Sequence, residues 1–147
     1  MKFQRLFALA VFLFSFVVPC FAHHMAVIVN KENEVENISA LHLAKIFRAD
    51  TRKWPDGKLI VVVLHSNSAG ETETLEHLIK VTPAEWKAFV ASHKDAVQIV
   101  DSDEDVRKAV EAIPGAVGLV DVRAVDGSIH VVRVDGKLPM ESGYLPH

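Results

Sequence analysis

The chain has 147 residues, with 19 acidic and 16 basic side chains and a formal net charge of −3 at pH 7. This length predicts one domain. The acidic balance, without any basic stripe, argues against nucleic acid as a partner. The single cysteine excludes a disulfide within the chain, so the domain must be held together by its hydrophobic core.

Residues 1–22 have the pattern of a secretory signal peptide. The start is basic, residues 6–18 are almost wholly apolar, and Cys20-Phe21-Ala22 ends in small residues typical of a cleavage site. The apolar run is short for a membrane span. An uncleaved anchor and a lipoprotein attached through the cysteine are the alternatives. We expect cleavage to leave a periplasmic domain of residues 23–147, and the loss of two basic residues shifts its net charge from −3 to −5.

The first elements of this domain are a strand and a helix. Residues 24–30 are apolar in their centre, which favours a strand. Residues 31–37 are polar and predict a surface loop. Ser39 is placed to cap a helix over residues 40–48. The apolar stripe of that helix consists of Leu43, Ile46 and Phe47.

A second strand and helix follow the turn Pro55-Asp56-Gly57. Residues 59–64 are apolar and mostly β-branched, which is typical of a strand buried on both faces. A helix over residues 69–80 should start after this strand, because Ser68 and Glu71 match the Ser-x-x-Glu capping box. The inward face of the helix consists of Leu75, Leu78 and Ile79.

The next helix should start at Thr82-Pro83-Ala84-Glu85, which has the N-cap, proline and glutamate of a second capping box. We expect this helix to bury Trp86, Phe89 and Val90. A strand over residues 96–100 follows it.

Ser102 predicts a fourth helix that ends at Pro114-Gly115. Acidic residues in its first turn suit the helix dipole, and its inward face consists of Val106, Ala109, Val110 and Ile113. Strands over residues 115–120 and 128–134 complete the pattern. Gly115 and Gly118 permit close backbone approach in the first of them. Residues 137–147 predict an irregular tail.

Strands that alternate with helices predict an α/β domain with a mostly parallel, five-stranded sheet and about four flanking helices. Ligands of such sheets bind at the carboxyl ends of strands. The loop at residues 65–71 leaves the end of a buried strand and opens a helix. Its hydroxyl groups and backbone N–H groups face a helix N-terminus, which favours anions. This loop is therefore the candidate ligand site.

Several segments, in this order, resemble phosphate-type periplasmic substrate-binding proteins of ABC transporters. They are Ile46-Phe47, Trp54-Pro55-Asp56-Gly57, the strand that ends in a Ser/Gly loop, Pro114-Gly115-Ala116-Val117-Gly118, and Asp135-Gly136-Lys137-Leu138-Pro139 with Gly143-Tyr144. The resemblance covers nearly all of residues 23–147. It implies a type II periplasmic binding protein-like fold. Members of this family have two lobes that close on the ligand, and this chain has material for a single lobe, the one that carries the second half of the phosphate site.

The loop departs from the family pattern in ways that weaken phosphate recognition. Family members place Arg-Ser-Asp-Gly-Ser-Gly-Thr where this chain has His65-Ser66-Asn67-Ser68-Ala69-Gly70-Glu71. The bidentate arginine is lost, and a histidine is only partly charged near neutral pH. Glu71 places a carboxyl group where the anion would lie. The ligand contacts that the resemblance implies are His65, Ser66, Asn67, Ser68 and Gly70, with backbone N–H groups contributing most and the histidine adding charge at lower pH.

We expect no catalysis, no metal and no cofactor. The chain has no Gly-x-Ser-x-Gly and no His-Glu-x-x-His motif. Ser66 and Ser68 lie near His65 in sequence, but that does not supply triad geometry. The eight histidines show no paired ligand spacing, and we expect them to be solvated.

The sequence thus predicts an exported, non-catalytic solute-binding domain that takes phosphate or another small oxyanion for an ABC transporter. The alternative is a protein-interaction or sensory module that kept the fold and lost the ligand. Such a module would dock an ABC permease, a membrane sensor or a second copy of the chain. The sequence leaves the identity of the ligand and the oligomeric state open.

Overall fold

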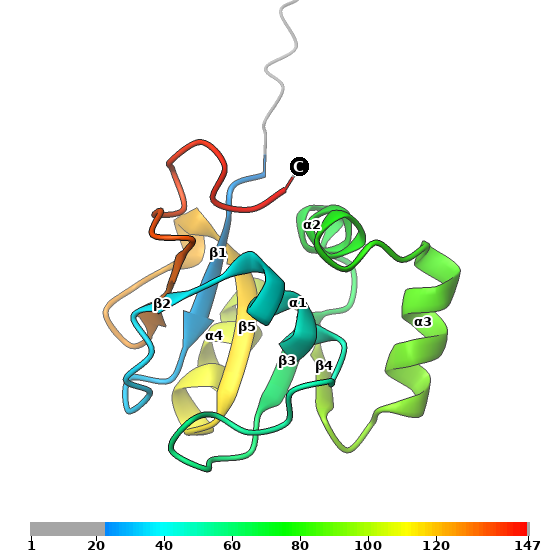
Figure 1. The fold of residues 1–147 in the computed structure, drawn as a ribbon, viewed down its shortest axis with the longest axis horizontal. Coiled ribbons are helices and arrows are strands. Elements are labelled where there is room, and N and C mark those ends of the chain that lie inside the picture. Colours follow the sequence, from blue (N-terminus) through cyan, green and yellow to red (C-terminus); the bar gives the residue numbers. More distant parts are fainter. Residues whose placement is uncertain (1–22, 147) are drawn as a thin grey trace, which may run out of the picture.

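The computed structural model describes residues 23–146, so the expected signal peptide lies outside the described residues. Helices and strands alternate along this part of the chain (Figure 1). The strands are β1 (Met25–Val29), β2 (Asn37–Ile38), β3 (Val61–His65), β4 (Val97–Val100), β5 (Ala116–Asp121), β6 (His130–Val131) and β7 (Arg133–Val134). The helices are α1 (Ala40–Phe47), α2 (Ala69–Ile79), α3 (Pro83–Ser92), α4 (Asp103–Ala112) and a 3-10 turn, η1 (Val122–Ala124).

The main sheet has five strands in the order β4-β3-β5-β1-β6. β3 is parallel to both β4 and β5, whereas β1 is antiparallel to its neighbours β5 and β6. All strands of the main sheet except β1 therefore run in one direction, and the expected α/β fold with a mostly parallel five-stranded sheet is confirmed. The reversed β1 brings the N-terminal end of the described chain to the edge at which β3, β4 and β5 end.

Helices cover both faces of the sheet. Successive side chains of a strand point to opposite faces, and all five residues of β1 are buried. Met25 and Val27 belong to the core that α1 and α2 complete, whereas Ala26 and Ile28 pack in the core formed with α4. Figure 1 shows α1 and α2 on one side of the sheet and α4 behind it. The apolar runs without alternation reflect this two-sided burial.

Two glycines on β5 and just before it are required by close packing, as predicted. A Cβ added to Gly115 would lie 1.9 Å from the backbone oxygen of Leu59. A Cβ added to Gly118 would lie 2.7 Å from Cγ1 of Val106 on α4. Distances this short do not occur for real Cβ atoms, so both positions exclude a side chain unless the backbone or α4 moves.

The predicted burial of the α3 side chains is wrong. α3 has the expected capping box between Thr82 and Glu85, yet none of its residues is buried. It lies at the β4 edge of the sheet, where it contacts α2 and packs only the partly buried Trp86 and Val90 against the core (Figure 1). Trp86 and Phe89 are half-buried and stack on each other with ring centroids 5.3 Å apart. Phe89 stacks in turn on His93 at 4.0 Å.

The predicted last strand, residues 128–134, is divided between two sheets. β6 pairs with β1 in the main sheet, whereas β7 pairs in parallel with β2 in a separate two-stranded sheet. β2 includes Asn37, which was expected in a surface loop. Pairing partners distant in sequence decide this division, and a local apolar pattern does not contain them.

The C-terminal tail is irregular, as predicted, but it is fixed to the core. Tyr144 is 3% exposed, and its hydroxyl group donates to the oxygen of Val132 at 2.6 Å. The same hydroxyl accepts from the N–H of Val27 at 3.0 Å. This side chain therefore ties the tail to β1. Burial raises the pKa of Tyr144 to about 12.

The titration of Tyr144 can be measured directly, because the sequence contains a single tyrosine. We expect the phenolate absorbance of the native protein to rise with a midpoint of about 12, against 10.0 for an ordinary tyrosine. A raised pKa means that the stabilising contribution of this group is complete below the unfolded value and is lost as the pH rises through the folded one. Tyr144→Phe serves as the blank. A native midpoint near 10 would contradict the buried position.

Candidate functional site

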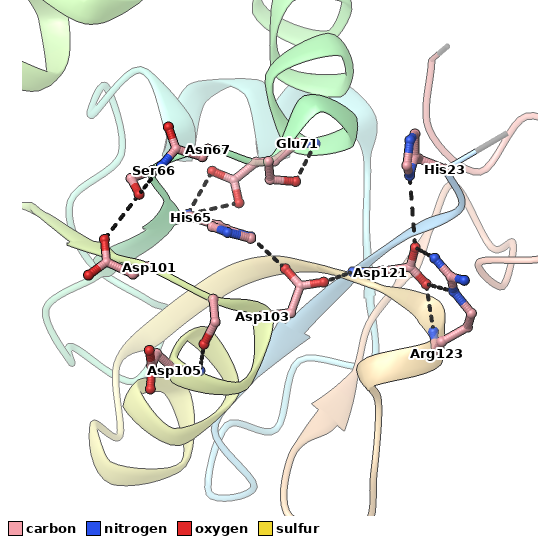
Figure 2. Close-up of polar contacts among 12 residues, drawn as sticks. His23, His65, Ser66, Asn67, Glu71, Asp101, Asp103, Asp105, Asp121 and Arg123 are labelled. Carbon is pink, nitrogen blue, oxygen red and sulfur yellow. Dashed lines mark hydrogen bonds and ion pairs between the residues drawn. The ribbon is translucent and has the colours of Figure 1, made fainter. Parts of the chain in front are cut away.

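The carboxyl ends of three parallel strands meet at one edge of the sheet. His65 ends β3, Asp101 follows β4 and Asp121 ends β5. Because β1 is reversed, His23 approaches the same edge, 4.0 Å from Asp121. Figure 2 shows these side chains gathered between the start of α2 and the start of α4. The predicted loop therefore lies where ligands of α/β sheets bind.

Ser66 and Asn67 present exposed polar side chains at the loop. The backbone N–H of Ser66 donates to the oxygen of Val100 at 2.9 Å, which ties the loop to β4. The hydroxyl of Ser66 donates to Asp101 at 3.2 Å, and the amide of Asn67 donates to Ser66 Oγ at 3.3 Å. These bonds are long and exposed, so a ligand can replace them at modest cost.

The start of α2 is capped by Ser68, whose hydroxyl accepts from the N–H of Glu71 at 3.1 Å. The N–H groups of Ala69 and Gly70 belong to the first turn, where the helix itself supplies no partner. Gly70 is buried under the N-terminal segment. A Cβ added there would lie 2.7 Å from His23 Cβ. The side chain of His23 therefore covers the Cα of Gly70.

Only half of the predicted capping box forms. Ser68 caps the helix, but the side chain of Glu71 reaches past it to the backbone N–H of His65, with both carboxyl oxygens at 3.1 Å. Glu71 is 3% exposed. Burial, and to a smaller extent the nearby charge of Asp103, raises the pKa of Glu71 well above its usual value. The group therefore takes up a proton more readily than an exposed glutamate.

His65 is held by an acidic partner, and the expectation of a solvated side chain is wrong for it. His65 Nδ1 lies 2.9 Å from Asp103 Oδ1, and the two side chains are 20% and 24% exposed. The other oxygen of Asp103 accepts from the N–H of Asp121 at 3.0 Å. Asp103 thus links the ends of β3 and β5, beyond its expected role in the first turn of α4.

A third acid at this edge is neutralised by an arginine. Arg123 donates from Nε and from its terminal nitrogen to the two oxygens of Asp121, each at 2.8 Å. This pairing lowers the pKa of Asp121 to about 2. The guanidinium is therefore committed to an internal partner at the rim of the site (Figure 2).

Two hollows adjoin the loop. A cleft of about 390 Å³ lies between β3, β4, α2 and α3, and its lining includes His65, Ser66, Glu71 and Thr72. An open depression of about 480 Å³ lies over the start of α2 and shares Ser66 and Thr72 with the cleft. It also contains the acidic Glu73 and Glu76. The donors available to an oxyanion at the loop are hydroxyl, amide and backbone N–H groups, and the cleft lining adds the ammonium group of Lys87.

Within residues 23–146, no cluster of three or more histidine, cysteine or acidic residues could hold a metal ion. No helix of the same range is both long and apolar enough to cross a membrane.

The structure places the five predicted contacts unequally: His65 and Ser66 line the cleft, Ser66, Asn67 and Ser68 line the depression, and Gly70 lines neither. The sequence prediction missed the acids around them. Asp101 and Asp121 each follow a predicted strand directly, and Asp103 comes two residues after Asp101. The rule that pointed to the loop at the end of β3 applies equally to the ends of β4 and β5. The signal was therefore present in the sequence.

Comparison with known proteins places this arrangement in a family. Residues 17–138 match the model of the PBP superfamily domain. The fold is similar to that of an ABC-type phosphate transport receptor from Vibrio cholerae, with a TM-score of 0.64 and 22% identity over 79% of this chain and 48% of that one.

Two further solved structures agree. A putative phosphate ABC transporter substrate-binding protein with bound phosphate, from Clostridium perfringens, gives a TM-score of 0.63 and 23% identity over 76% of this chain and 45% of the other. PstS from Borrelia burgdorferi gives a TM-score of 0.63 and 18% identity over 79% of this chain and 49% of the other. The chain thus spans about half the length of each of these proteins.

Proposed function

The chain belongs to the PBP superfamily, and on that premise we propose that it is an exported solute-binding domain that takes phosphate or a related small oxyanion in the periplasm. It binds without catalysing a reaction and serves an ABC permease. The resemblance to phosphate receptors supports this assignment through the fold. The site itself supports it through one observation: exposed Ser66 and Asn67 stand at the start of α2, beside an open cleft.

Each predicted contact has a defined part in the proposed site. Ser66 and Asn67 donate from their side chains, and Gly70 contributes its backbone N–H. Ser68 keeps the first turn of α2 ordered, so that its N–H groups stay aligned toward the ligand. His65 forms part of the cleft wall, and its Nδ1 is held 2.9 Å from Asp103 Oδ1.

The acids at this edge limit the affinity for an anion. Asp121 is paired with Arg123, and Asp103 lies against His65. The raised pKa of Glu71 reduces its negative charge relative to an ordinary glutamate at the same pH. Ser66 and Asn67 are exposed, so a ligand bound to residues 23–147 alone stays open to water on one side, which weakens every electrostatic contact. We therefore expect weaker binding than in a closed two-lobed receptor.

Calorimetry of residues 23–147 with inorganic phosphate and sulfate tests the proposal. Saturable heat is expected, and Ser68→Ala should weaken binding by about tenfold because the first turn of α2 loses its cap. The same change lowers the unfolding free energy by about 1 kcal/mol.

Ser39→Ala is the matched control. Ser39 caps α1 in the same way, by accepting from the N–H of His42 at 3.1 Å, and it does not line the cleft or the depression beside the loop. Ser39→Ala should lower the unfolding free energy by a similar amount and leave the affinity for the oxyanion unchanged. Absence of heat with every oxyanion, or equal losses of affinity in both variants, would overturn the proposed site.

A further inference from the structure

The cleft beside the loop is lined by two chemically different sets of residues. His65, Ser66, Glu71 and Thr72 form the polar lining, which is shared with the proposed oxyanion site. The apolar lining comes from β3, β4 and α3 and consists of Leu64, Pro83, Trp86, Val90 and Ile99. Inorganic phosphate makes no favourable contact with an apolar surface, because its oxygen atoms point outward in every direction.

The volume of the cleft also exceeds the need of a single oxyanion. About 390 Å³ lies within the range of pockets that bind organic ligands, roughly 300–1,000 Å³. Such pockets are mostly apolar, with a few polar groups that fix orientation. The cleft beside the loop has this composition.

Trp86 is a rigid part of the apolar lining. It stacks almost parallel on Phe89, with an interplanar angle of 13°, and Phe89 stacks on His93. An aromatic side chain held by its neighbours binds apolar groups with little loss of conformational entropy. Ile99, on the edge strand β4, is 52% exposed although it is large and apolar.

The cleft lining also contains a positive charge, which favours an anionic ligand. Lys87 is the one lysine or arginine among the residues that line the cleft. It is exposed, and no ion pair is found for it among the described residues. By contrast, Arg123 at the same sheet edge is paired with Asp121.

We propose that the ligand is an organic oxyanion, a phosphonate or phosphate monoester whose aromatic or branched aliphatic group lies against Trp86, Val90 and Ile99. The oxyanion itself occupies the loop at residues 65–71, so this inference rests on the proposed function and narrows its ligand class. Lys87 adds positive charge at the rim.

Calorimetry with a matched pair of anions, phenylphosphonate and methylphosphonate, tests the organic group separately from the anion. The wild-type chain should bind phenylphosphonate at least tenfold more tightly. Trp86→Ala should abolish this preference by weakening the binding of phenylphosphonate far more than that of methylphosphonate, and Trp86→Phe should restore part of it. Since α3 contains no buried residue, far-UV circular dichroism should show that these variants keep the fold.

Two lysine variants test the contribution of charge. Lys87→Gln should weaken the affinity for both phosphonates several-fold. Lys94→Gln, which removes an exposed lysine outside the cleft lining, should change neither affinity. Equal affinities for the two phosphonates, or a preference that survives in Trp86→Ala, would overturn the inference and leave the oxyanion site standing. Failure of both phosphonates and of inorganic phosphate to bind would overturn the proposed function as well.

Discussion

Gly115→Ala is expected to lower the free energy of unfolding by at least about 3 kcal/mol, the range of severe overpacking. The added Cβ would lie 1.9 Å from the backbone oxygen of Leu59, and a backbone atom cannot rotate away as a side chain can. The oxygen of Gly115 also accepts from Trp54 Nε1 at 3.0 Å and from the N–H of Val61 at 3.1 Å. Any shift that relieves the clash therefore disturbs the start of β3. Urea unfolding followed by tryptophan fluorescence measures the loss.

Gly127→Ala is the matched control for this substitution. Apart from the glycine and its chain neighbours, no heavy atom lies within 4 Å of a Cβ built at Gly127. The change should therefore leave stability unaltered or raise it by up to about 1 kcal/mol through the unfolded chain. If both variants unfold at the same urea concentration as the wild type, the close approach of Gly115 to Leu59 is not present in solution.

Glu71→Gln is expected to stabilise the protein at neutral pH by about 1–3 kcal/mol, the scale for burying a polar group. Glutamine keeps an oxygen that accepts from the N–H of His65 and removes a buried ionisable group. The attraction between a carboxylate and the start of a helix opposes this gain but is smaller, about 0.3–1 kcal/mol.

The pH dependence distinguishes this cause from ordinary repacking. Because the folded pKa of Glu71 is raised, its contribution to stability is complete below the unfolded value, 4.5, and is lost as the pH rises through the folded value. The variant should therefore match the wild type near pH 4 and exceed it increasingly above that pH. Glu73→Gln changes an exposed residue on the same helix, and its free energy of unfolding should stay within about 0.5 kcal/mol of the wild-type value at every pH. A gain from Glu71→Gln that does not vary with pH would contradict a buried, titrating carboxyl group.

The candidate site was predictable in its position and only partly in its chemistry. The loop at residues 65–71 was placed correctly because a strand that ends in small polar residues and a capped helix is a local pattern. The hydrogen-bond partner of the Glu71 side chain could not be predicted from the local pattern. Spacing alone favoured a bond back to Ser68, whereas in the fold the carboxyl group of Glu71 accepts from the N–H of His65 at 3.1 Å and the residue is 3% exposed. The pairing of His65 with Asp103 likewise joins residues 38 positions apart.

The sequence by itself determined the order of the four α-helices and of the five strands of the main sheet. It also determined the caps at Ser39, Ser68, Thr82 and Ser102 and the two-sided burial of the sheet, because hydrophobic periodicity and capping act within a few residues. Only the tertiary structure decided that β1 is reversed, that residues 130–134 divide between two sheets, and that α3 stands at an edge with Trp86 turned toward a cleft. These outcomes depend on which distant surfaces pair. An apolar residue in a helix signals that it will be covered, but the covering partner is chosen by the whole fold, or by a ligand.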